Sequence, residues 1–411
     1  MSYARLLTLL YEQNQFSIKY DLDAMRLALL REGLDRDQHT LRILVGGTNG
    51  KGTVCSLLHA ALHNAGKRVG VYTSPHLVDF RERIRVNGAP IPESDCARLG
   101  LKLWETYSGR VGESPAGRAL SYFELTTLIA FHWFREQDVE VEVIEVGMGG
   151  RLDATNAQDP DISVITSVSL DHQAYLGDTV HKIAWEKSFI ARPGRPCLLA
   201  SNTDGAVEAA TAVAAQGGDL RIIPTSGPAR SQNDALAQAA FELACHRLGV
   251  DAGTWSERTR GCAWPGRQQV LVAKGRTWLI DGAHNVASVR ECCGWLAGRS
   301  EVAKAGRVHA LVGLSPDKDP LTILGPLLAF FRSVTCVRVD TQRTQDPEFV
   351  AAELQRATEA PVQSLPDAAA AISSEVWGPG ETVAVIGSLY LVGSVLRELG
   401  ATPESLAIVD V

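Results

Sequence analysis

A glycine-rich segment with a single lysine, GGTNGKGT at 46–53, has the composition needed to bind phosphate. An apolar run at 42–46 precedes it, and a helical pattern at 52–65 follows it. Glycines let backbone N–H groups turn toward an anion, and the first turn of a helix adds the positive end of its dipole. Lys51 would reach the terminal phosphates as a point charge. The segment therefore predicts a nucleotide phosphate site between a buried strand and a helix.

This segment departs from the general P-loop pattern GxxxxGK[ST]. Counted back from Lys51, the pattern requires glycine at 45 and serine or threonine at 52, where this chain has Val45 and Gly52. The hydroxyl expected on Mg²⁺ is displaced, so metal ligands are expected elsewhere. The alternative interpretation is an ordinary turn between a strand and a helix, but four glycines and a lysine at a helix N-terminus favour phosphate binding.

Polar side chains near the ends of other apolar runs could supply those ligands. Ser74 follows one run, Glu145 lies near the end of a second, and the pair Asp171-His172 follows a third. A carboxylate at a strand end is costly to bury unless it is paired or metal-bound, and oxygen ligands suit Mg²⁺. The structural alternatives are a Ser-Pro turn, a salt-bridged strand end and a hydrogen-bonded Asp-His pair.

Strands alternate with helices along the first part of the chain, which predicts a parallel sheet with helices on both faces. In such a sheet, the carboxyl ends of the strands face the ligand crevice. The expected strands are 42–46, 68–73, 139–146, 162–168 and 196–200, and the expected helices are 52–65, 94–107, 122–135, 179–191, 204–216 and 233–249.

A junction rich in Gly, Trp, Arg and Pro at 250–268 separates this part from a second alternation. We predict an α/β fold with a P-loop doubly wound, mostly parallel domain at 1–266 and a smaller Rossmann-like domain at 267–411. In the second domain the expected strands are 277–281, 307–313, 333–339 and 382–387, and the expected helices are 285–297, 319–331, 347–357 and 389–399.

Composition limits the class of protein. The chain has 411 residues, too many for one hydrophobic core, with 45% hydrophobic and 21% charged residues. A net charge of −7 argues against nucleic acid as a partner, and the absence of a signal peptide and of a long apolar run argues against a membrane. Eight cysteines without a CxxC pair indicate reduced thiols, so we expect a cytoplasmic protein, and a monomer.

The variant loop GTNGKG[ST] resembles the Mur ligase superfamily, and the extra glycine resembles its folylpolyglutamate synthase/dihydrofolate synthase branch in particular. Other ordered motifs of that branch occur as YTSPH at 72–76, EVGMGGRLDATN at 145–156, LDHQAYLGDTVHKIAWEK at 170–187 and GSLYLV at 387–392. The resemblance runs from about residue 16 to residue 393.

The resemblance implies a metal site and a modified lysine. Ser74, Glu145 and His172 would ligate Mg²⁺, although Mn²⁺ would also be tolerated. Lys187 matches a lysine that is carbamylated in relatives, where it assists a second Mg²⁺. WEKSFI replaces the usual GEKAGI around this lysine.

The resemblance also implies the nucleotide and substrate sites. WPGR at 264–267 and LIDGAHN at 279–285 belong to the part that would close on the nucleotide, with Val286 where the family usually has proline. The stretch at 16–25 departs from the family pattern of the pterin site, and Lys318 would orient phosphate or the amino acid. The implied ATP-binding residues are Gly47, Thr48, Asn49, Gly50, Lys51, Gly52, Thr53, Asn233, Arg267, Asp281 and His284, and the implied pterin-binding residues are Phe123 and Asp153.

The expected activity is ATP-dependent ligation of L-glutamate to a pterin or folate carboxylate through an acyl phosphate, with Lys51, His172 and Lys187 as catalytic residues. ATP, Mg²⁺, the pterin and glutamate are the only partners expected. One alternative is a muramyl-type amino-acid ligase, and another is a nucleotide-hydrolysing switch. The GKGT loop and the GSLYLV segment argue against the first, and the loop register together with the lack of a guanine-reading NKxD motif argues against the second.

Overall fold

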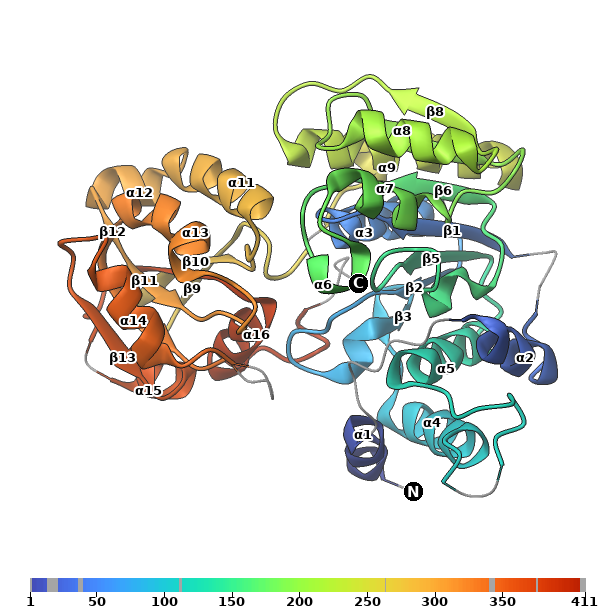
Figure 1. The fold of residues 1–411 in the computed structure, drawn as a ribbon, viewed down its shortest axis with the longest axis horizontal. Helices are drawn as coiled ribbons and strands as arrows, with labels where there is room; N and C mark the ends of the chain where they lie inside the picture. Colours follow the sequence, from blue (N-terminus) through green and yellow to red (C-terminus); the bar gives the residue numbers. More distant parts are fainter. Residues whose placement is uncertain are drawn as a thin grey trace. The chain divides into compact units, whose positions relative to one another are not determined.

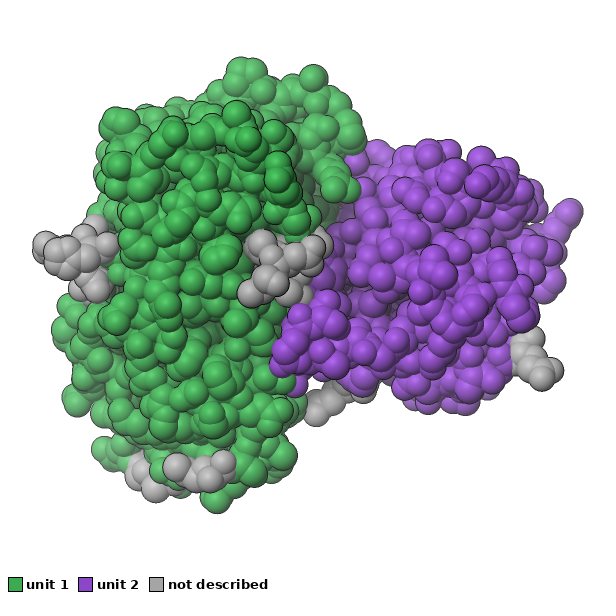
Figure 2. Space-filling view, turned by 180° about the vertical axis from the view of Figure 1, so that it is seen from behind, with its two compact units in different colours: residues 1–74, 81–263, 407–411 green, residues 75–80, 264–406 purple. Residues whose placement is uncertain are grey.

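A computed structural model describes most of the chain as two compact units. Unit 1 contains the described residues of 1–74 and 81–263, and unit 2 contains those of 75–80 and 264–406 (Figure 2). The residues that the structure describes are 2–12, 21–35, 40–110, 113–262, 264–339, 344–374 and 376–406. The first half of the atypical stretch at 16–25, residues 16–20, therefore lies outside them.

Unit 1 is built on an eight-stranded sheet in the order β4-β3-β2-β5-β1-β6-β7-β8. Six neighbouring strands run parallel, in the order β2, β5, β1, β6, β7 and β8. Strands β3 and β4 add an antiparallel edge beside β2. The strands are β1 Leu41–Gly46, β2 Val69–Tyr72, β3 Ile84–Val86, β4 Ala89–Pro90, β5 Val141–Glu145, β6 Ile162–Ile165, β7 Pro196–Ala200 and β8 Asp219–Ile223.

The central strands of this sheet are buried on both faces, because continuous apolar runs such as LRILVG in β1 leave few polar residues to face water. Helix α3 packs on β1, β2 and β5, and its neighbour α9 packs on β6, β7 and β8, whereas α5 contacts β2 and α8 contacts β7 (Figure 1). The helices are α1 Tyr3–Glu12, α2 Asp23–Arg31, α3 Lys51–Asn64, α4 Glu93–Tyr107, α5 Tyr122–Glu136, α6 Gln173–Leu176, α7 Val180–Ser188, α8 Ala206–Ala215, α9 Ala229–Leu248 and α10 Trp255–Arg258, with 3₁₀ turns η1 Phe80–Arg83 and η2 Ala154–Ala157.

Unit 2 contains a six-stranded sheet in the order β13-β12-β11-β14-β10-β9, parallel except for β9. Alternate residues of β10 enter two apolar layers: Leu279 packs with α11 and α14, while Trp278 and Ile280 pack with α15 and α16. The elements are β9 Gln269–Ala273, β10 Arg276–Asp281, α11 Val286–Ala297, α12 Ser300–Ala305, β11 Val308–Val312, α13 Pro320–Leu324, η3 Gly325–Phe330, β12 Phe331–Val337, α14 Pro347–Gln355, β13 Val362–Leu365, α15 Ala368–Ser373, β14 Thr382–Ile386 and α16 Leu389–Glu398.

The predicted fold class, a doubly wound and mostly parallel sheet followed by a smaller α/β unit, is confirmed. The helix predicted at 319–331 is wrong in part, because it divides at Gly325 into the short helix α13 and a 3₁₀ turn. Pro326 has no N–H to continue an α-helix. None of the helices in the described part of the chain combines the length and apolar character needed to cross a membrane.

Candidate functional site

The predicted phosphate loop lies at the carboxyl end of β1, where β1 runs between β5 and β6. Gly47 has a φ of 141°, and a Cβ there would lie 1.9 Å from the Thr166 hydroxyl oxygen, so only glycine fits. Gly50, at a φ of 88°, precedes helix α3, and a Cβ there would lie 2.5 Å from the Asn233 amide oxygen. The structure therefore brings the Asn233 side chain beside the loop.

The start of α3 leaves backbone donors available for an anion. The first N–H groups of any α-helix have no partner within the helix. Among the described residues, no side chain caps this helix at Gly50. The N–H groups of Lys51, Gly52 and Thr53 are therefore the donors, together with the helix dipole, that a phosphate would meet.

A hydroxyl-rich segment after β6 holds the loop in shape, and the sequence reasoning missed it. The Thr48 N–H donates to the Ser167 carbonyl at 2.8 Å, and the Asn49 N–H donates to the Ser167 hydroxyl at 3.1 Å. The Thr166 hydroxyl donates to the Asn49 carbonyl at 2.6 Å. Thr166 and Ser167 fall inside the strand expected at 162–168, whereas β6 ends at Ile165, so no spacing in the sequence marked their hydroxyls as part of the site.

Two lysines meet at one carbonyl of the loop. Lys187 Nζ donates to the Gly47 carbonyl at 2.9 Å, and Lys51 Nζ donates to the same oxygen at 3.2 Å. Lys187 is only 3% exposed. Burial lowers the pKa of Lys187 to about 7, and the charge of Lys51 lowers it further while Asp171 and Asp153 oppose the shift. A neutral, nucleophilic amine is therefore available at Lys187 near neutral pH.

The predicted metal ligands Ser74 and Glu145 are in direct contact. Glu145 is the last residue of β5, is buried, and accepts a hydrogen bond from the Ser74 N–H at 3.0 Å. In the register of the sheet, Glu145 stands beside Val45, two residues before Gly47. A carboxylate and a hydroxyl beside a phosphate loop fit Mg²⁺, which proteins hold through one or two carboxylates together with substrate phosphates and water.

The third predicted ligand, His172, follows the neighbouring strand β6. It lies immediately before α6 with a φ of 49°, a left-handed conformation that is uncommon for a residue other than glycine. The backbone N–H of His172 donates to the Asp171 carboxylate at 2.9 Å, so the alternative of a hydrogen-bonded Asp-His pair also holds. Within the described ranges, no group of three or more His, Cys, Asp and Glu side chains is assembled as a metal site.

The two residues predicted at the pterin site have different surroundings. The Phe123 ring is partly exposed and packs on Gly147, where a Cβ would lie 2.5 Å from the ring, and on the ring of Tyr72 at 5.9 Å. Asp153 is buried, and its carboxylate accepts hydrogen bonds from the N–H groups of Met148 at 2.9 Å and Thr155 at 3.0 Å. Burial raises the pKa of Asp153 against these bonds. Asp153 thus shapes its own loop.

The predicted residues of unit 2 form one cluster at the end of β10. The buried Asp281 carboxylate accepts from the Gln268 N–H at 3.0 Å and from the Ala283 N–H at 2.8 Å, which fixes the turns that carry Arg267 and His284. Burial raises the pKa of Asp281, and the charge of Arg267 opposes it. His284 Nδ1 lies 2.8 Å from the Gly282 carbonyl, which can only accept, so Nδ1 carries the proton.

Three other sequence features of unit 2 also have defined surroundings. Asn285 caps α11, as the structural interpretation of the DGAHN turn expected, and Val286 is exposed. Lys318 pairs with Asp317 at 3.2 Å. Gly393 directly follows the GSLYLV segment. It allows α16 to approach the main chain of Leu77, since a Cβ at Gly393 would lie 1.9 Å from the Leu77 carbonyl oxygen.

Comparison with known proteins gives a consistent set of relatives. The family model "Mur ligase, glutamate ligase domain" matches residues 266–389. The dihydrofolate synthase/folylpolyglutamate synthase of Escherichia coli is 32% identical over 424 residues, covering 95% of this chain and 94% of that protein. A probable bifunctional folylpolyglutamate synthase/dihydropteroate synthase of Haloferax volcanii is 32% identical over 95% of this chain, and the chain spans about half (50%) of its length. The human mitochondrial folylpolyglutamate synthase is 34% identical over 74% of this chain, which spans 60% of that protein.

Solved structures agree with these relatives over almost the whole chain. Escherichia coli FolC in complex with DHPP and ADP superposes with a TM-score of 0.82 at 28% identity, covering 97% of each chain. A bifunctional folylpolyglutamate synthase/dihydrofolate synthase from Yersinia pestis, complexed with AMPPNP and an Mn ion, superposes with a TM-score of 0.80 at 27% identity, covering 98% of each chain.

Proposed function

The chain belongs to the folylpolyglutamate synthase/dihydrofolate synthase family, and from this premise we propose that it is an ATP-dependent ligase. It joins L-glutamate to the carboxylate of dihydropteroate, of a reduced folate, or of both, and releases ADP and phosphate. One observation carries the proposal: the phosphate loop, the Ser74–Glu145 contact and the Lys187 amine lie together at the carboxyl ends of the central strands β1 and β5. The E. coli neighbour was solved with DHPP and ADP, which supports this choice of substrates.

The chemistry requires activation because a carboxylate is a poor acyl donor. Its oxygen attacks the γ-phosphorus of ATP, which forms an acyl phosphate and releases ADP. The glutamate amine then attacks the acyl carbon, and the tetrahedral intermediate expels inorganic phosphate as the amide forms. The protein's task is to align three partners and to neutralise phosphate charge.

The loop of unit 1 performs the phosphate part of this task. The N–H groups at the start of α3 and the ammonium of Lys51 bind the β- and γ-phosphates. Gly47, Thr48, Asn49, Gly50, Gly52 and Thr53 complete the cradle, and Asn233 borders the nucleotide from α9. The Thr166–Ser167 segment keeps the loop preorganised through its hydrogen bonds to Thr48 and Asn49.

Ser74, Glu145 and His172 would hold Mg²⁺, which would supply positive charge to the phosphates when it is bound. The Yersinia neighbour was solved with an Mn ion, and the oxygen-rich donor set here accepts the same class of cation. Lys187 is proposed to be carbamylated and so to assist a second Mg²⁺. Its buried amine, with a pKa of about 7, attacks CO₂, forms an N–C bond and loses one proton, which leaves a carbamate.

The remaining roles follow the expected domains, 1–266 and 267–411. Phe123 forms a wall of the pterin site, and Asp153 supports it by holding the loop at 148–155. The second domain is proposed to close on ATP through Arg267, Asp281 and His284 and to bind glutamate, in keeping with its match to a glutamate ligase domain. Lys318 would orient phosphate or glutamate.

We further propose that the protein acts as a cytoplasmic monomer without nucleic acid or membrane partners. Light scattering of the purified protein at several concentrations should give a mass near 44.3 kDa. A constant mass twice as large would contradict the monomer.

The proposed function is tested by supplying dihydropteroate and tetrahydrofolate in parallel, each with ATP and with or without glutamate. ADP release that requires both an acceptor and glutamate is the expected result. ADP release that is independent of glutamate would indicate a nucleotide-hydrolysing switch, and turnover only with a muramyl precursor would indicate a cell-wall ligase.

A further inference from the structure

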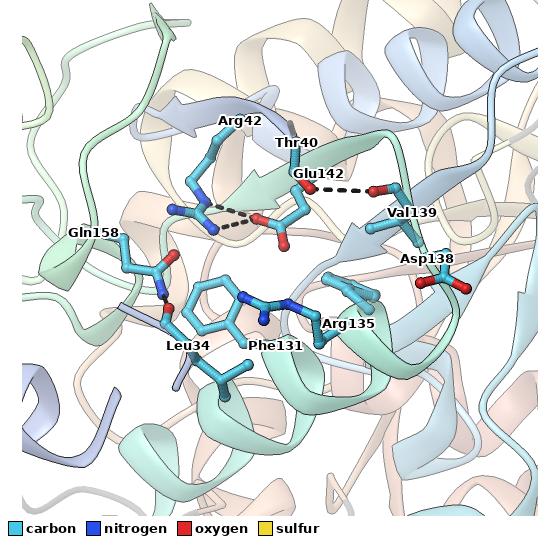
Figure 3. A pocket seen from close by; sticks show the side chains of 10 residues that line it. Leu34, Thr40, Arg42, Phe131, Arg135, Asp138, Val139, Glu142 and Gln158 are labelled. Atoms are coloured by element: carbon cyan, nitrogen blue, oxygen red, sulfur yellow. Dashed lines mark hydrogen bonds and ion pairs between the residues drawn. The ribbon is translucent and has the colours of Figure 1, made fainter. Parts of the chain in front are cut away.

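Polar side chains gather at the amino-terminal ends of strands in both units. In unit 1 they line a small cavity of about 40 Å³ beside β1 and β5 (Figure 3). Arg42 and Glu142 pair with each other there, the Thr40 hydroxyl donates to a backbone carbonyl, and Arg135 and Asp138 add one more charge of each sign. Among the described residues that line this cavity there is no histidine, so nothing in it activates the hydroxyl.

The cluster of unit 2 differs because hydrogen bonds join a serine, a histidine and a glutamate in series. The Ser333 hydroxyl oxygen lies 2.7 Å from His309 Nδ1, and Glu381 Oε2 lies 3.0 Å from His309 Nε2. Ser333 is on β12, His309 is on β11, and Glu381 directly precedes β14. The cluster therefore lies at the end of the sheet opposite to Asp281, which is the last residue of the parallel neighbour β10.

A β-bulge in β12 turns Ser333 toward the face that carries His309. The pairing with β11 skips Arg332 and places His309 opposite Ser333. Phe331 and Val334 consequently both enter the apolar layer of α11 and α14, although they are three residues apart. With regular alternation, Ser333 would share the layer of Phe331 and point away from the histidine. Bulges of this kind re-aim a side chain and are frequent beside active sites.

The hydrogen bonds fix the position of the proton on His309. A carboxylate can only accept, so Nε2 carries the proton that Glu381 accepts. Nδ1 of the neutral ring then has a lone pair, which accepts the Ser333 hydroxyl proton. Burial lowers the pKa of His309 below its ordinary value of 6.5, Glu381 opposes this shift, and the charge of Arg332 adds to it. The ring is therefore neutral near pH 7 and serves as a base toward the hydroxyl.

We propose that Ser333, His309 and Glu381 form a nucleophilic triad that accepts acyl groups from activated carboxylic esters. Such a triad is defined by its geometry and roles, which here are a hydroxyl, a base and a carboxylate that orients the base. Compared with the triad of serine proteases, the two ring nitrogens exchange their partners. Ser333 and His309 would be the catalytic residues, and Glu381 a positioning residue.

The reaction has two steps that balance. Ser333 Oγ attacks the acyl carbon while His309 Nδ1 takes the hydroxyl proton, and the bond to the leaving oxygen breaks as that oxygen receives the proton. Water then attacks the acyl-serine with His309 again as base, which releases the carboxylic acid and restores the Ser333 hydroxyl.

The triad reaches the surface of unit 2. The side chains of Glu381 and His309 are 33% and 13% exposed, and Ser333 is partly exposed. Arg332, the extra residue of the bulge, pairs with Glu381 at 3.3 Å and supplies positive charge for the oxyanion that develops in acyl transfer. One exposed cation stabilises an oxyanion less than two fixed N–H groups do. We therefore expect slow turnover, and a reactive probe gives the clearest test.

The proposal does not rest on the ligase function, because the triad and Asp281 lie at opposite ends of the unit 2 sheet. The probe is a fluorophosphonate, applied to the full chain. A bond forms between Ser333 Oγ and phosphorus, the phosphorus–fluorine bond breaks, fluoride leaves, and the hydroxyl proton passes to His309. Mass spectrometry of the peptides should find one adduct, on Ser333. The absence of an adduct, or an adduct on Lys187 instead, would overturn the proposal.

Variants and pH separate an activated serine from one with a structural role. Ser333→Ala should abolish labelling, and Ser364→Ala, on the neighbouring strand β13, should leave it unchanged. His309→Gln should slow labelling at least about a hundredfold. The rate in wild type should rise with pH through the lowered pKa of His309 and stay level from pH 7 to 9. Equal labelling of wild type and Ser333→Ala, or a rate that keeps rising to pH 9, would overturn the proposal.

Ligation of glutamate should be the same in wild type and Ser333→Ala, which keeps the two activities distinguishable. Should Ser333→Ala fail to fold, the position of the adduct in the wild-type protein decides the matter.

Discussion

Lys187 and Lys51 share one acceptor, the carbonyl oxygen of Gly47, at 2.9 and 3.2 Å. Two ammonium groups around one carbonyl repel each other, and the more buried one is easier to deprotonate. Burial is the main reason that the pKa of Lys187 falls to about 7, and the charge of Lys51 lowers it further. The Gly47 carbonyl of the phosphate loop therefore accepts from two lysines, and Lys187, which comes from α7, is the one whose pKa is lowered.

The buried amine makes stability depend on pH in a defined direction. The pKa of Lys187 is 10.5 as the ordinary value and about 7 in the folded protein, so the unfolded chain binds more protons between these values. The free energy of unfolding should therefore rise with pH from 7 to 10.5, by about 5 kcal/mol as an upper limit, and this group should add no pH dependence below pH 7. Urea unfolding of wild type and Lys187→Met at pH 6.5 and 9 measures it.

Comparison of the two proteins removes the contribution of other titrating groups. Lys187→Met should lose most of the rise between pH 6.5 and 9. Addition of ¹³C-bicarbonate to the wild type should give a carbamate NMR signal that Lys187→Met lacks. Identical pH slopes in the two proteins would contradict the assignment of the shifted pKa to Lys187.

Removal of the Glu145 charge should weaken metal binding. Glu145 is buried beside the phosphate loop and contacts Ser74, so Glu145→Gln should raise the Mg²⁺ concentration for half-maximal activity at least about tenfold. His172→Ala should raise it as well. Glu140→Gln is the control, because Glu140 precedes the same strand and pairs with Lys67 at 3.0 Å. A Mg²⁺ titration that is unchanged in His172→Ala would remove His172 from the ligand set.

His59 in α3 should contribute to acid unfolding. It is fully buried and, within the described residues, neither ring nitrogen has a hydrogen-bond partner. Burial, with the nearby His63 and Arg85 charges, lowers the pKa of His59 from 6.5 to about 3. The unfolded state therefore takes up the proton first, and stability should fall by about 3 kcal/mol as pH drops from 6.5 to 4.

The measurement is the pH dependence of unfolding by urea. His59→Leu should flatten the loss of stability between pH 6.5 and 4, whereas His246→Leu, at an exposed position of α9, should not. The same acid profile in wild type and His59→Leu would show that His59 is not responsible.

Two helical glycines of unit 2 give opposite predictions for the same substitution. Gly393→Ala should destabilise the protein by about 1–3 kcal/mol, because its Cβ would lie 1.9 Å from the Leu77 carbonyl and force the main chain apart. Gly294→Ala in α11 has no atom within 4 Å of the new Cβ and should stabilise by about 0.5–1 kcal/mol. Thermal unfolding of the two variants compares them directly. Equal shifts would mean that helix propensity alone decides both.

The sequence predicts the buried strands well because apolar runs such as 42–46 and 196–200 have few other places to lie. It does not predict β8, Asp219–Ile223, since this edge strand is largely solvent-facing and has no continuous apolar run. The short strands β3 and β4 are equally invisible, because their pairing depends on the neighbouring β2 more than on their own pattern.

For the candidate site, single residues were easier to predict than their support. The lysine and the glycines of the loop carry a recognisable spacing. The hydroxyls of Thr166 and Ser167 do not, because their role exists only once β6 lies beside β1. Asp153 shows the same limit. Its carboxylate accepts hydrogen bonds from two N–H groups of its own loop, and the spacing of residues in the sequence does not reveal how that loop folds.

The central claim is that ATP activates a pterin carboxylate for attack by glutamate, and an isotope experiment tests it most directly. Dihydropteroate labelled with ¹⁸O in both carboxylate oxygens is incubated with ATP, Mg²⁺, glutamate and the enzyme, and the products are analysed by mass spectrometry. The account predicts one ¹⁸O in the released phosphate and one in the amide of the glutamyl product, with neither formed by Lys51→Ala. Unlabelled phosphate alongside a glutamyl product, or phosphate released without any product, would contradict it.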